Sequence, residues 1–507
     1  MSEQKIAKGL KEVWQIRGVG LLIMALASIA AGSYLFSPLT GFLFFRQLAV
    51  GRWIRANGEV PFADMWTQAG RDRVWHDGSW LWDLLIAMIE RVPFESSFLT
   101  LKLLLGIFLC LALANCFSRC SGSLFFGFVI SMPVVSGILY RATLDSSLIA
   151  YVLTALILLL LSPWFTGQRA GWLGCLLLFL SAILLSNTYE DHLLVLLFIS
   201  GLLVGSYDRS SRSLPIFLLL SPVFLTPYFG AQALQETASS VSSFFDRLSF
   251  NPNPGSLYNF ETSFVILVWA LALVLVLENR SLKKLKLLRF VFLPLTLSVT
   301  ALVDVGLAPW ALIFSGLVVS ISWRIGEESG GNFRTFIVKI RNALAAVDPA
   351  PAGFLFFCIV FVNIKKSAQL PIGTDYTPLP ADLEDALGEL EGASVLHNRE
   401  LGDYLVYLYS DHNGSVLKKP HLDSRVAVFS RELSKREMKA EGLVDGGVSL
   451  YSWLDPKYVL CRTKTPLCKL FIEEPSWNPV ENKNPDSNTR HFQGLWTLLS
   501  SEGDEVR

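Results

Sequence analysis

The residue types with the widest chemical range gather in one polar stretch, GRWIRANGEVPFADMWTQAGRDRVWHDGSWL, at positions 51–81. This stretch sets three aspartates, a histidine and several arginines among tryptophans, and apolar segments flank it on both sides. Carboxylates can take a proton from a reacting group or hold a divalent cation, and arginine can grip a phosphate through its planar fork of donors. The sequence therefore predicts that any chemistry is concentrated here.

Within this stretch we nominate three candidate catalytic residues and two candidate phosphate-binding residues: Asp64, His76 and Asp77, and then Arg71 and Arg73. Each also has a plainer interpretation. Aspartate is favoured at caps, so Asp64 can simply cap a helix or a turn. Two adjacent side chains such as His76 and Asp77 rarely both point into one site, and the arginines can be solvated loop charges. Both interpretations stay open on the residues alone.

A second polar group, SNTYEDHLL, interrupts two apolar runs farther along the chain. It contains Glu190, Asp191 and His192, which we take as candidate substrate-binding residues. Titratable side chains at a membrane boundary are costly to bury and are often functional. The alternative is a hydrated turn that only separates two helices.

The elements that must position these residues are apolar helices. Of 507 residues, 52% are apolar and 17% are charged, and the mean hydropathy is +0.45. A bilayer core about 30 Å thick needs about 20 apolar residues per helix. The runs predict an α-helical polytopic membrane protein of about eleven transmembrane helices, at 19–36, 98–117, 123–140, 146–163, 171–186, 191–206, 214–230, 261–278, 290–306, 308–323 and 347–364. Residues 290–323 can instead form a broken or re-entrant segment, because Asp304 and Pro309 interrupt them.

The distribution of lysine and arginine predicts the orientation of these helices. Cytoplasmic loops carry the positive excess in membrane proteins. With an odd helix count and a cytoplasmic N-terminus, the cytoplasmic loops carry many lysines and arginines, including the cluster at 280–289, whereas the short loops on the opposite side hold almost none. The first long loop, the Glu190 group and the C-terminal region then lie on the exterior face. No cleavable signal sequence precedes the first apolar run, which we expect to remain as the first helix.

The chain divides into five parts on these criteria: 1–36, a cytoplasmic lead and the first helix; 37–97, an exterior loop with interfacial helices; 98–364, the helical bundle; 365–380, a linker; and 381–507, a small exterior α/β domain. In that domain residues 394–397 and 457–461 are strand-like, 383–390 and 430–441 are helix-like, and 401–409 is ambiguous. Cys461 and Cys468 close a short loop, in which export permits a disulfide.

The order of these parts resembles the GT-C fold of membrane glycosyltransferases. More narrowly, GRWIRANGEVPFADMWTQAGRDRVWHDGSWLWDLL is similar to a set of bacterial GT-C-like proteins whose first loop contains G-x-W-I-x-x-x-G-x-V-P-x-x-D, then G-x-x-W, then W-L. Four C-terminal segments are similar to the strand and helix pattern of the same set: ASVLHNRELGDYLVYLY, HLDSRVAVF, LDPKYVL and PSWNPVEN. The resemblance covers nearly the whole chain.

This resemblance implies a glycosyltransferase of a bacterial inner membrane that moves a sugar from a polyprenyl-phosphate donor to an exported acceptor. It implies that Asp64 is the catalytic base or a ligand of a divalent cation, Mg²⁺ or Mn²⁺. The implied partners are membrane lipids, the lipid-linked sugar and other membrane proteins of a complex. Nucleic acid is not an expected partner, because 43 basic residues balance 43 acidic ones.

Two further functions are compatible with the sequence. The set commonly has an acidic residue and a histidine where this chain has Gly41 or Leu43 and Gln47, and a histidine near Gly78 and Ser79. These departures motivate a catalytically lapsed relative that serves as a membrane scaffold or complex subunit. A transporter is the third possibility, although no inverted repeat is visible. The motifs HExxH, GxxxxGK[ST], GxSxG and paired CxxC are absent from the sequence, which removes the usual support for several enzyme classes.

Overall fold

The computed structural model describes the core of the helical bundle, the first loop and parts of the C-terminal region. The described segments are 41–68, 73–75, 77–91, 94–139, 142–168, 170–205, 213–228, 307–329, 395–397, 399–420, 457–462 and 496–500, with the single positions 230, 234, 238, 294, 295, 379, 383, 384, 387, 468, 471, 476, 478 and 479. The predicted spans 19–36, 261–278, 290–306 and 347–364, the linker and the helix at 430–441 lie wholly or almost wholly outside these residues.

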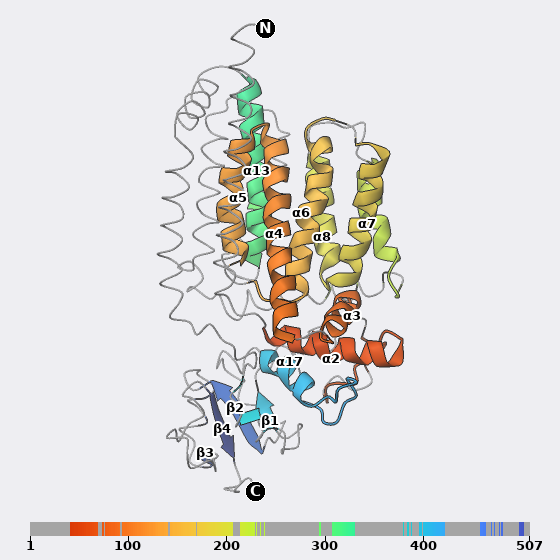
Figure 1. Cartoon of the computed structure of the whole chain (residues 1–507), viewed down its shortest axis with the longest axis vertical. Helices are drawn as coiled ribbons and strands as arrows, with labels where there is room; N and C mark the ends of the chain where they lie inside the picture. Colours follow the sequence, from red (N-terminus) through yellow and green to blue (C-terminus); the bar gives the residue numbers. More distant parts are fainter. Residues whose placement is uncertain are drawn as a thin grey trace.

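Six upright helices form the described part of the bundle (Figure 1). They are α4 (Phe94–Ser121), α5 (Leu124–Leu139), α6 (Ser146–Phe165), α7 (Trp172–Thr188), α8 (His192–Gly205) and α13 (Ala308–Ser329). Each matches a predicted apolar run to within a few residues. Two helical segments, Ser97–Ser121 and Ser146–Phe165, are long and apolar enough to cross a membrane by themselves.

The turns of the bundle form where the sequence supplies a cap or a glycine. Asp145 caps α6, because its carboxylate accepts a hydrogen bond from the Ser147 amide at 2.8 Å. Gly167, just after α6, has a φ of 76°, a left-handed conformation that glycine adopts at little cost. Asp145 and Gly167 thus mark the start and the end of α6, near the two ends of its apolar run.

One predicted span is interrupted. Residues 214–230 were expected to form one helix, whereas the structure has α9 (Ser213–Leu220) followed by a 3-10 turn, η1 (Ser221–Phe224). Pro222 lies at the start of η1 and has no backbone N–H to continue the α-helical hydrogen bonds. At about 1.5 Å per residue, α9 is too short to cross the bilayer.

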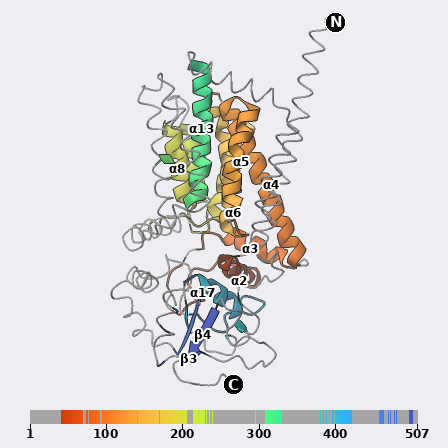
Figure 2. The same ribbon diagram turned by 90° about the vertical axis from the view of Figure 1, so that its left-hand side faces the viewer.

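Two helices lie across one end of the bundle, between it and the sheet, in both ribbon views (Figures 1 and 2). These are α2 (Phe42–Asn57) and α3 (Trp80–Ile89), both from the loop for which interfacial helices are predicted. They pack closely, because a Cβ built on Gly51 of α2 would lie 1.9 Å from the Asp83 carbonyl oxygen of α3. The first loop thus forms a packed layer under the upright helices.

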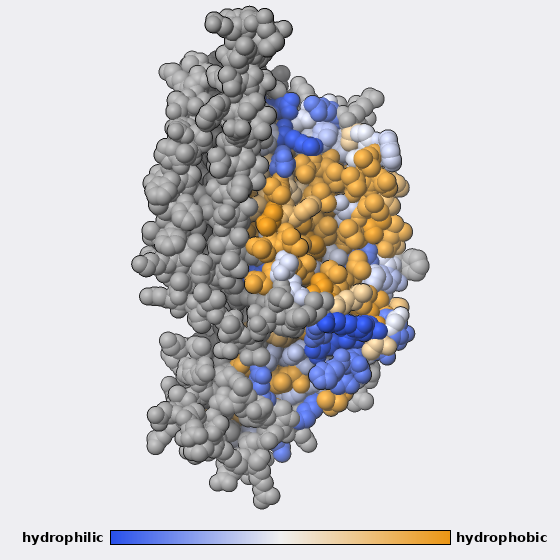
Figure 3. Space-filling view, in the orientation of Figure 1, coloured by the Kyte–Doolittle hydropathy of each residue, from blue (hydrophilic) through white to orange (hydrophobic). Residues whose placement is uncertain are grey.

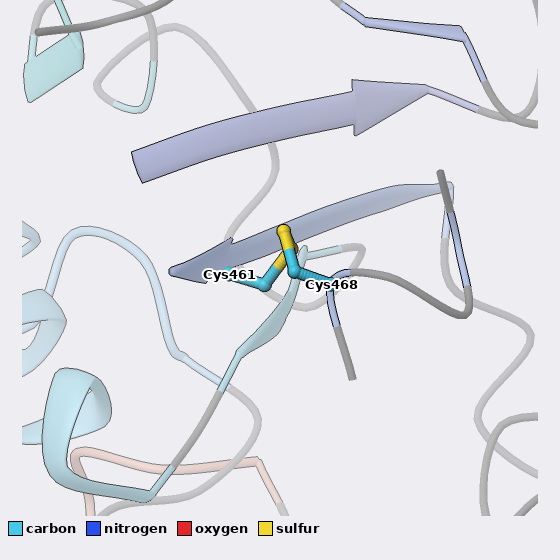
Figure 4. Close-up of a disulfide and its surroundings, with 2 residues drawn as sticks. All are labelled: Cys461 and Cys468. Carbon is cyan, nitrogen blue, oxygen red and sulfur yellow. A yellow bond between two sulfur atoms is a disulfide. The ribbon is translucent and has the colours of Figure 1, made fainter. Parts of the chain in front are cut away.

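The C-terminal region contributes a small mixed sheet and one helix. Its elements are β1 (Val395–His397), α17 (Arg399–Leu408), β2 (Tyr458–Arg462), β3 (Asn478–Pro479) and β4 (Trp496–Ser500), and the strand order is β1-β2-β4-β3. β1 pairs with β2 in parallel, and β4 is antiparallel to both β2 and β3. Both strands predicted at 394–397 and 457–461 are present, and the ambiguous segment at 401–409 is helical. Figure 4 shows the disulfide between Cys461 and Cys468, whose Cα atoms are 5.4 Å apart.

The outer surface of the bundle is apolar. Figure 3 shows a band of hydrophobic side chains over the upright helices, with hydrophilic side chains at both ends of the band. On α7, for example, the exposed apolar residues recur on one face, at Trp172, Leu173, Leu176, Leu177, Leu180 and Leu184. Exposed leucine at helical spacing is the pattern of a lipid-facing surface.

Candidate functional site

The centre of the candidate site is a buried arginine of α2. Arg46 is only 2% exposed, although it carries a full charge. Its Nη2 donates to Glu190 Oε1 in the turn between α7 and α8 at 2.8 Å, and its Nη1 lies 3.5 Å from Asp403 Oδ1 of α17. A buried charge is tolerated only when it is paired, and here two carboxylates from distant segments supply the pairing.

A pair of buried aspartates accompanies this arginine. Asp77 in the loop before α3 and Asp83 in the first turn of α3 are both almost completely buried, and their carboxyl groups contact each other. Asp77 Oδ1 accepts hydrogen bonds from the Ser79 amide at 3.0 Å and the Ser79 hydroxyl at 3.1 Å. Two other carboxyl oxygens, Asp77 Oδ2 and Asp83 Oδ1, are buried and have no hydrogen-bond donor among the residues that the structure describes.

The environment of this aspartate pair favours the protonated form. Burial, and next the Glu190 carboxylate, raise the pKa of Asp77 to about 6. Burial and the neighbouring Asp77 raise the pKa of Asp83 well above its ordinary value. The Arg46 guanidinium acts in the opposite direction on both groups. Two buried carboxyl groups that face each other in this way share a proton or a cation rather than two negative charges.

The donor set fits a divalent cation that completes its coordination from substrate. In the described part of the chain, no group of three or more His, Cys, Asp or Glu side chains is placed to hold a metal. Magnesium, however, commonly binds through one or two carboxylates together with water and substrate phosphates. The donor-free oxygens of Asp77 and Asp83 meet that requirement, whereas a structural zinc site would need four protein ligands.

Hydrogen bonds between separate elements fix the segments around the site. Trp80 Nε1 at the start of α3 donates to Asn187 Oδ1 near the end of α7 at 2.9 Å. The Tyr228 hydroxyl donates to the Pro61 carbonyl at 2.9 Å, and the ring of Tyr228 lies edge-on to that of Phe62. The segment after η1 is therefore fixed against the first loop on the same side as Asp77.

Two of the departures from the resembled pattern, Gln47 and Gly78, have structural roles. Gln47 is fully buried, and its side-chain oxygen accepts a hydrogen bond from the Ser146 amide at the start of α6 at 3.3 Å. Gly78 lies against the Glu190 turn, because a Cβ at Gly78 would be only 2.8 Å from the Glu190 Cα. A larger residue at position 78 would push the turn away from Asp77.

Asp64, the leading candidate from the sequence, lies in a turn. Its carboxylate accepts hydrogen bonds from the Trp66 amide at 3.0 Å and from the Thr67 hydroxyl. The Asp64 amide donates to the Arg73 carbonyl at 2.9 Å, which places Arg73 on the facing side of a short hairpin. The geometry of Asp64 is that of the capping role, and its catalytic role stays a prediction. His76 and Arg71 lie outside the described residues.

In the second predicted group, the structure gives Glu190, Asp191 and His192 different surroundings. Glu190 joins Arg46 and is 26% exposed, so it is both part of the cluster and accessible. Asp191 is partly exposed in the same turn. His192 is buried, and its Nδ1 is 2.8 Å from the Tyr189 carbonyl oxygen. Of the predicted site residues that the structure describes, Asp77 and Glu190 come together in this cluster.

The sequence analysis missed three members of this cluster: Arg46, Asp83 and Asp403. Two of them carried a usable signal. Asp83 is the one charged residue in the apolar helix WLWDLLIAMI, and Arg46 stands in the similarly apolar run GFLFFRQLAV. A charge within such a run is costly unless it is paired, so both could have been nominated. Asp403 carried no such signal, because its helix is amphipathic.

Sequence comparison alone assigns no relative, since no protein-family model and no curated protein matches the chain. Solved structures do match. The archaeal oligosaccharyltransferase AglB from Archaeoglobus fulgidus, in complex with an inhibitory peptide and a dolichol-phosphate, aligns with a TM-score of 0.54 at 11% identity, over 90% of this chain and 70% of that chain. The apo form of the Archaeoglobus fulgidus oligosaccharyltransferase aligns with a TM-score of 0.53 at 10% identity, over 88% and 70%.

A third structure of the Archaeoglobus fulgidus oligosaccharyltransferase, tethered to an acceptor peptide, aligns with a TM-score of 0.51 at 10% identity, over 90% of this chain and 70% of that chain. At such low identity these likenesses concern the fold. The chain shares the mostly helical fold of these oligosaccharyltransferases, which is the GT-C fold that the resemblance implied. An identity of 10–11% does not assign the chain to a family within this fold.

Proposed function

We propose that this protein is a GT-C-type membrane glycosyltransferase that moves a sugar from a polyprenyl-phosphate donor to an exported acceptor. We place it in a bacterial inner membrane, with the N-terminus cytoplasmic and the C-terminal domain outside. The likeness to an oligosaccharyltransferase that was solved with a dolichol-phosphate supports a lipid-linked donor. That likeness to enzymes does not favour the scaffold alternative.

The observation that carries this proposal is the buried Asp77–Asp83 pair beside the Arg46–Glu190 ion pair. Arg46 belongs to α2 and Asp83 to α3, and Glu190 belongs to the turn between α7 and α8, so the pairs lie where the α2–α3 layer meets the upright helices; Figure 1 shows that layer at one end of the bundle. A lipid-linked donor keeps its phosphate at this level of the membrane. Burying several ionisable groups at such a boundary is costly and is typical of a functional site.

Each group has a role that follows from its surroundings. Asp77 and Asp83 would hold a divalent cation, Mg²⁺ or Mn²⁺, which when bound neutralises the charge on the departing phosphate. Glu190 is the accessible carboxylate and can accept the proton of the acceptor, while Arg46 keeps its side chain in place. Ser79 fixes the carboxylate of Asp77 through two hydrogen bonds. We retain Arg71 and Arg73 as proposed phosphate ligands, and Asp191 and His192 as proposed substrate contacts.

The test is sugar transfer by the full-length protein in liposomes with a panel of polyprenyl-phosphate sugars. We expect Asp83→Asn to lower kcat by about a hundredfold or more, because it removes a cation ligand and part of the charge stabilisation. EDTA should abolish transfer and Mg²⁺ or Mn²⁺ should restore it. The exposed acid Glu59 in the same loop supplies the matched control, Glu59→Gln, which should leave the rate unchanged.

The same assay decides between the two carboxylate assignments. Asn in place of Asp64 can still cap the turn, so Asp64→Asn should change kcat by less than about tenfold if the Asp77–Asp83 pair is the centre. A larger loss for Asp64→Asn than for Asp83→Asn would return the catalytic role to Asp64. Absence of transfer from every donor, together with a fixed co-purifying partner and no bound lipid, would support the scaffold function instead.

A further inference from the structure

The helix α17 of the C-terminal region is docked on α2 by aromatic side chains. The ring of Phe45 on α2 lies edge-on to Tyr404, with centroids 4.9 Å apart, and is 5.2 Å from the ring of Tyr407. The Arg52 guanidinium carbon lies 4.8 Å from the centroid of Tyr407, in cation–π contact. These contacts cover two turns of α2 on the face toward the exterior region.

Backbone contacts extend the same interface. A Cβ built on Gly414, just after α17, would lie 2.5 Å from both the Ala49 carbonyl oxygen and the Trp53 amide nitrogen, so the two backbones touch. The Gln68 amide of the first loop donates to the Pro420 carbonyl at 3.0 Å. The segment from α17 to Pro420 is thus held rigidly against α2 rather than tethered by a flexible linker.

Asp403 lies inside this interface. It is 2% exposed, and its Oδ1 is 3.5 Å from Arg46 Nη1, while Nη2 of the same guanidinium donates to Glu190 at 2.8 Å. The rigid fork of arginine is therefore shared between a carboxylate of the exterior region and one of the bundle. Arg46 also acts electrostatically on Asp77 from the first loop and on Asp83 from α3.

We propose that Asp403 is a positioning residue for the candidate site: it anchors Arg46 from the exterior side, and Arg46 in turn fixes Glu190 beside the aspartate pair. The inference rests on the proposed function for its kinetic part and on geometry alone for its structural part. Without the Asp403 charge, the guanidinium loses its anchor on the exterior side, and the turn that carries Glu190 is held less firmly. The exterior domain is then a component of the catalytic centre, in addition to any role in binding an acceptor.

The kinetic test compares Asp403→Asn, Asp403→Glu and Asp411→Asn in the full chain. Asp411 belongs to the same segment, and its carboxylate accepts from the Asn413 and Ser415 amides, roles that asparagine can keep. We expect Asp403→Asn to lower kcat about tenfold with the KM for the donor unchanged, since misplacement affects the reacting geometry more than binding. Asp403→Glu should restore most of the rate, and Asp411→Asn should match the wild type.

A second kinetic arm asks whether Asp403 acts through Arg46. If it does, the double variant Arg46→Gln with Asp403→Asn should lose no more activity than Arg46→Gln alone. Additive losses, a rise in KM that accounts for the whole effect, or no rescue by Asp403→Glu would each overturn the proposal and leave Asp403 as an ordinary structural contact.

Hydrogen–deuterium exchange provides a readout that does not depend on sugar transfer. In Asp403→Asn, the amides of the peptide spanning 187–195 should exchange about tenfold faster than in the wild type, because the Arg46 guanidinium that pairs with Glu190 in the α7–α8 turn is no longer anchored by Asp403. Asp411→Asn should leave that peptide unchanged. Unchanged exchange in Asp403→Asn overturns the inference even if the protein is a glycosyltransferase. Faster exchange supports it even if no donor is turned over.

Discussion

At the scale of single residues, Asp77 is the group whose surroundings matter most. Ser79 satisfies one of its oxygens, while burial and Glu190 oppose ionisation and Arg46 favours it. Burial is the largest of these effects and raises the pKa of Asp77 from 3.8 to about 6. A carboxylic acid with a pKa close to neutral can exchange a proton, or give it up to a cation, without a large change in free energy.

This shift predicts how stability depends on pH in the absence of a divalent cation. The folded chain binds the Asp77 proton more tightly than the unfolded chain does. The contribution of Asp77 to stability, about 3 kcal/mol, is therefore fully present below about pH 4 and is lost as the pH rises through about 6. In EDTA, the unfolding temperature of the wild type should decrease through this window. Asp77→Asn should flatten the decrease, because its amide does not titrate.

The exposed acid Glu59 is the control for this measurement. Its carboxylate is in solvent, so Glu59→Gln should keep the wild-type dependence on pH. Equal slopes for the wild type and Asp77→Asn would show that Asp77 is not protonated preferentially in the folded state.

At the scale of elements, α2 organises the site, because it contacts both α3 and α17 and carries Arg46 and Gln47. Its close approach to α3 depends on Gly51, where a Cβ would meet the Asp83 carbonyl oxygen at 1.9 Å and the Ala87 Cβ at 3.0 Å. Both contacts involve atoms that cannot rotate away. The absence of a side chain at position 51 therefore sets the position of Asp83.

We expect Gly51→Ala to destabilise the protein by about 1–3 kcal/mol, the usual cost of overpacking, and to separate α2 from α3. The unfolding temperature should fall, and transfer activity should fall further than stability alone explains, because Asp83 moves with α3. Gly171→Ala is the matched control, since Gly171 has a φ of −70° and a Cβ there meets no atom within 4 Å. Equal unfolding temperatures for the two variants would contradict the packing argument.

The elements were more predictable than the site. The helices α4 to α8 follow apolar runs that polar turns separate, so periodicity and length are sufficient to locate them. The break at Pro222 was missed because the apolar run continues through it, although proline itself was a warning. The segment at 401–409 was ambiguous because it is short, and its contact with α2 decides its conformation.

The site depends on contacts between segments that are far apart in the chain, and no local sequence pattern predicts those contacts. Arg46 and Glu190 are 144 positions apart, and only the packing of α2 beneath the α7–α8 turn brings them together. The first loop drew attention to Asp77 because its residue types were unusual, and its catalytic role stays a prediction. The selection of Asp64 followed a motif, whereas its surroundings in the fold are those of a capped turn. Arg46 and Asp83 stood out as charges inside apolar runs, but the sequence does not show which partners neutralise them.

At the scale of the whole molecule, the proposed reaction requires the candidate site to face the exterior. The α2–α3 layer and α17 lie at one end of the upright helices, and the turn between α6 and α7 lies at the other (Figure 1). The predicted orientation puts Arg169, next to that turn, in the cytoplasm. A site at the opposite end then opens to the face on which an exported acceptor arrives.

This orientation can be measured with single cysteines and a membrane-impermeant maleimide. Leu417, after α17, is 70% exposed, and Gln168, after α6, is also exposed. In cells whose outer layers admit the reagent, Leu417→Cys should label directly, whereas Gln168→Cys should label only after the inner membrane is permeabilised. The wild-type chain gives the background from native thiols. The reverse pattern would place the candidate site in the cytoplasm and the Cys461–Cys468 disulfide in a reducing compartment, where such bonds rarely persist. The proposal of an exported acceptor and the prediction of an exterior domain would then both be wrong.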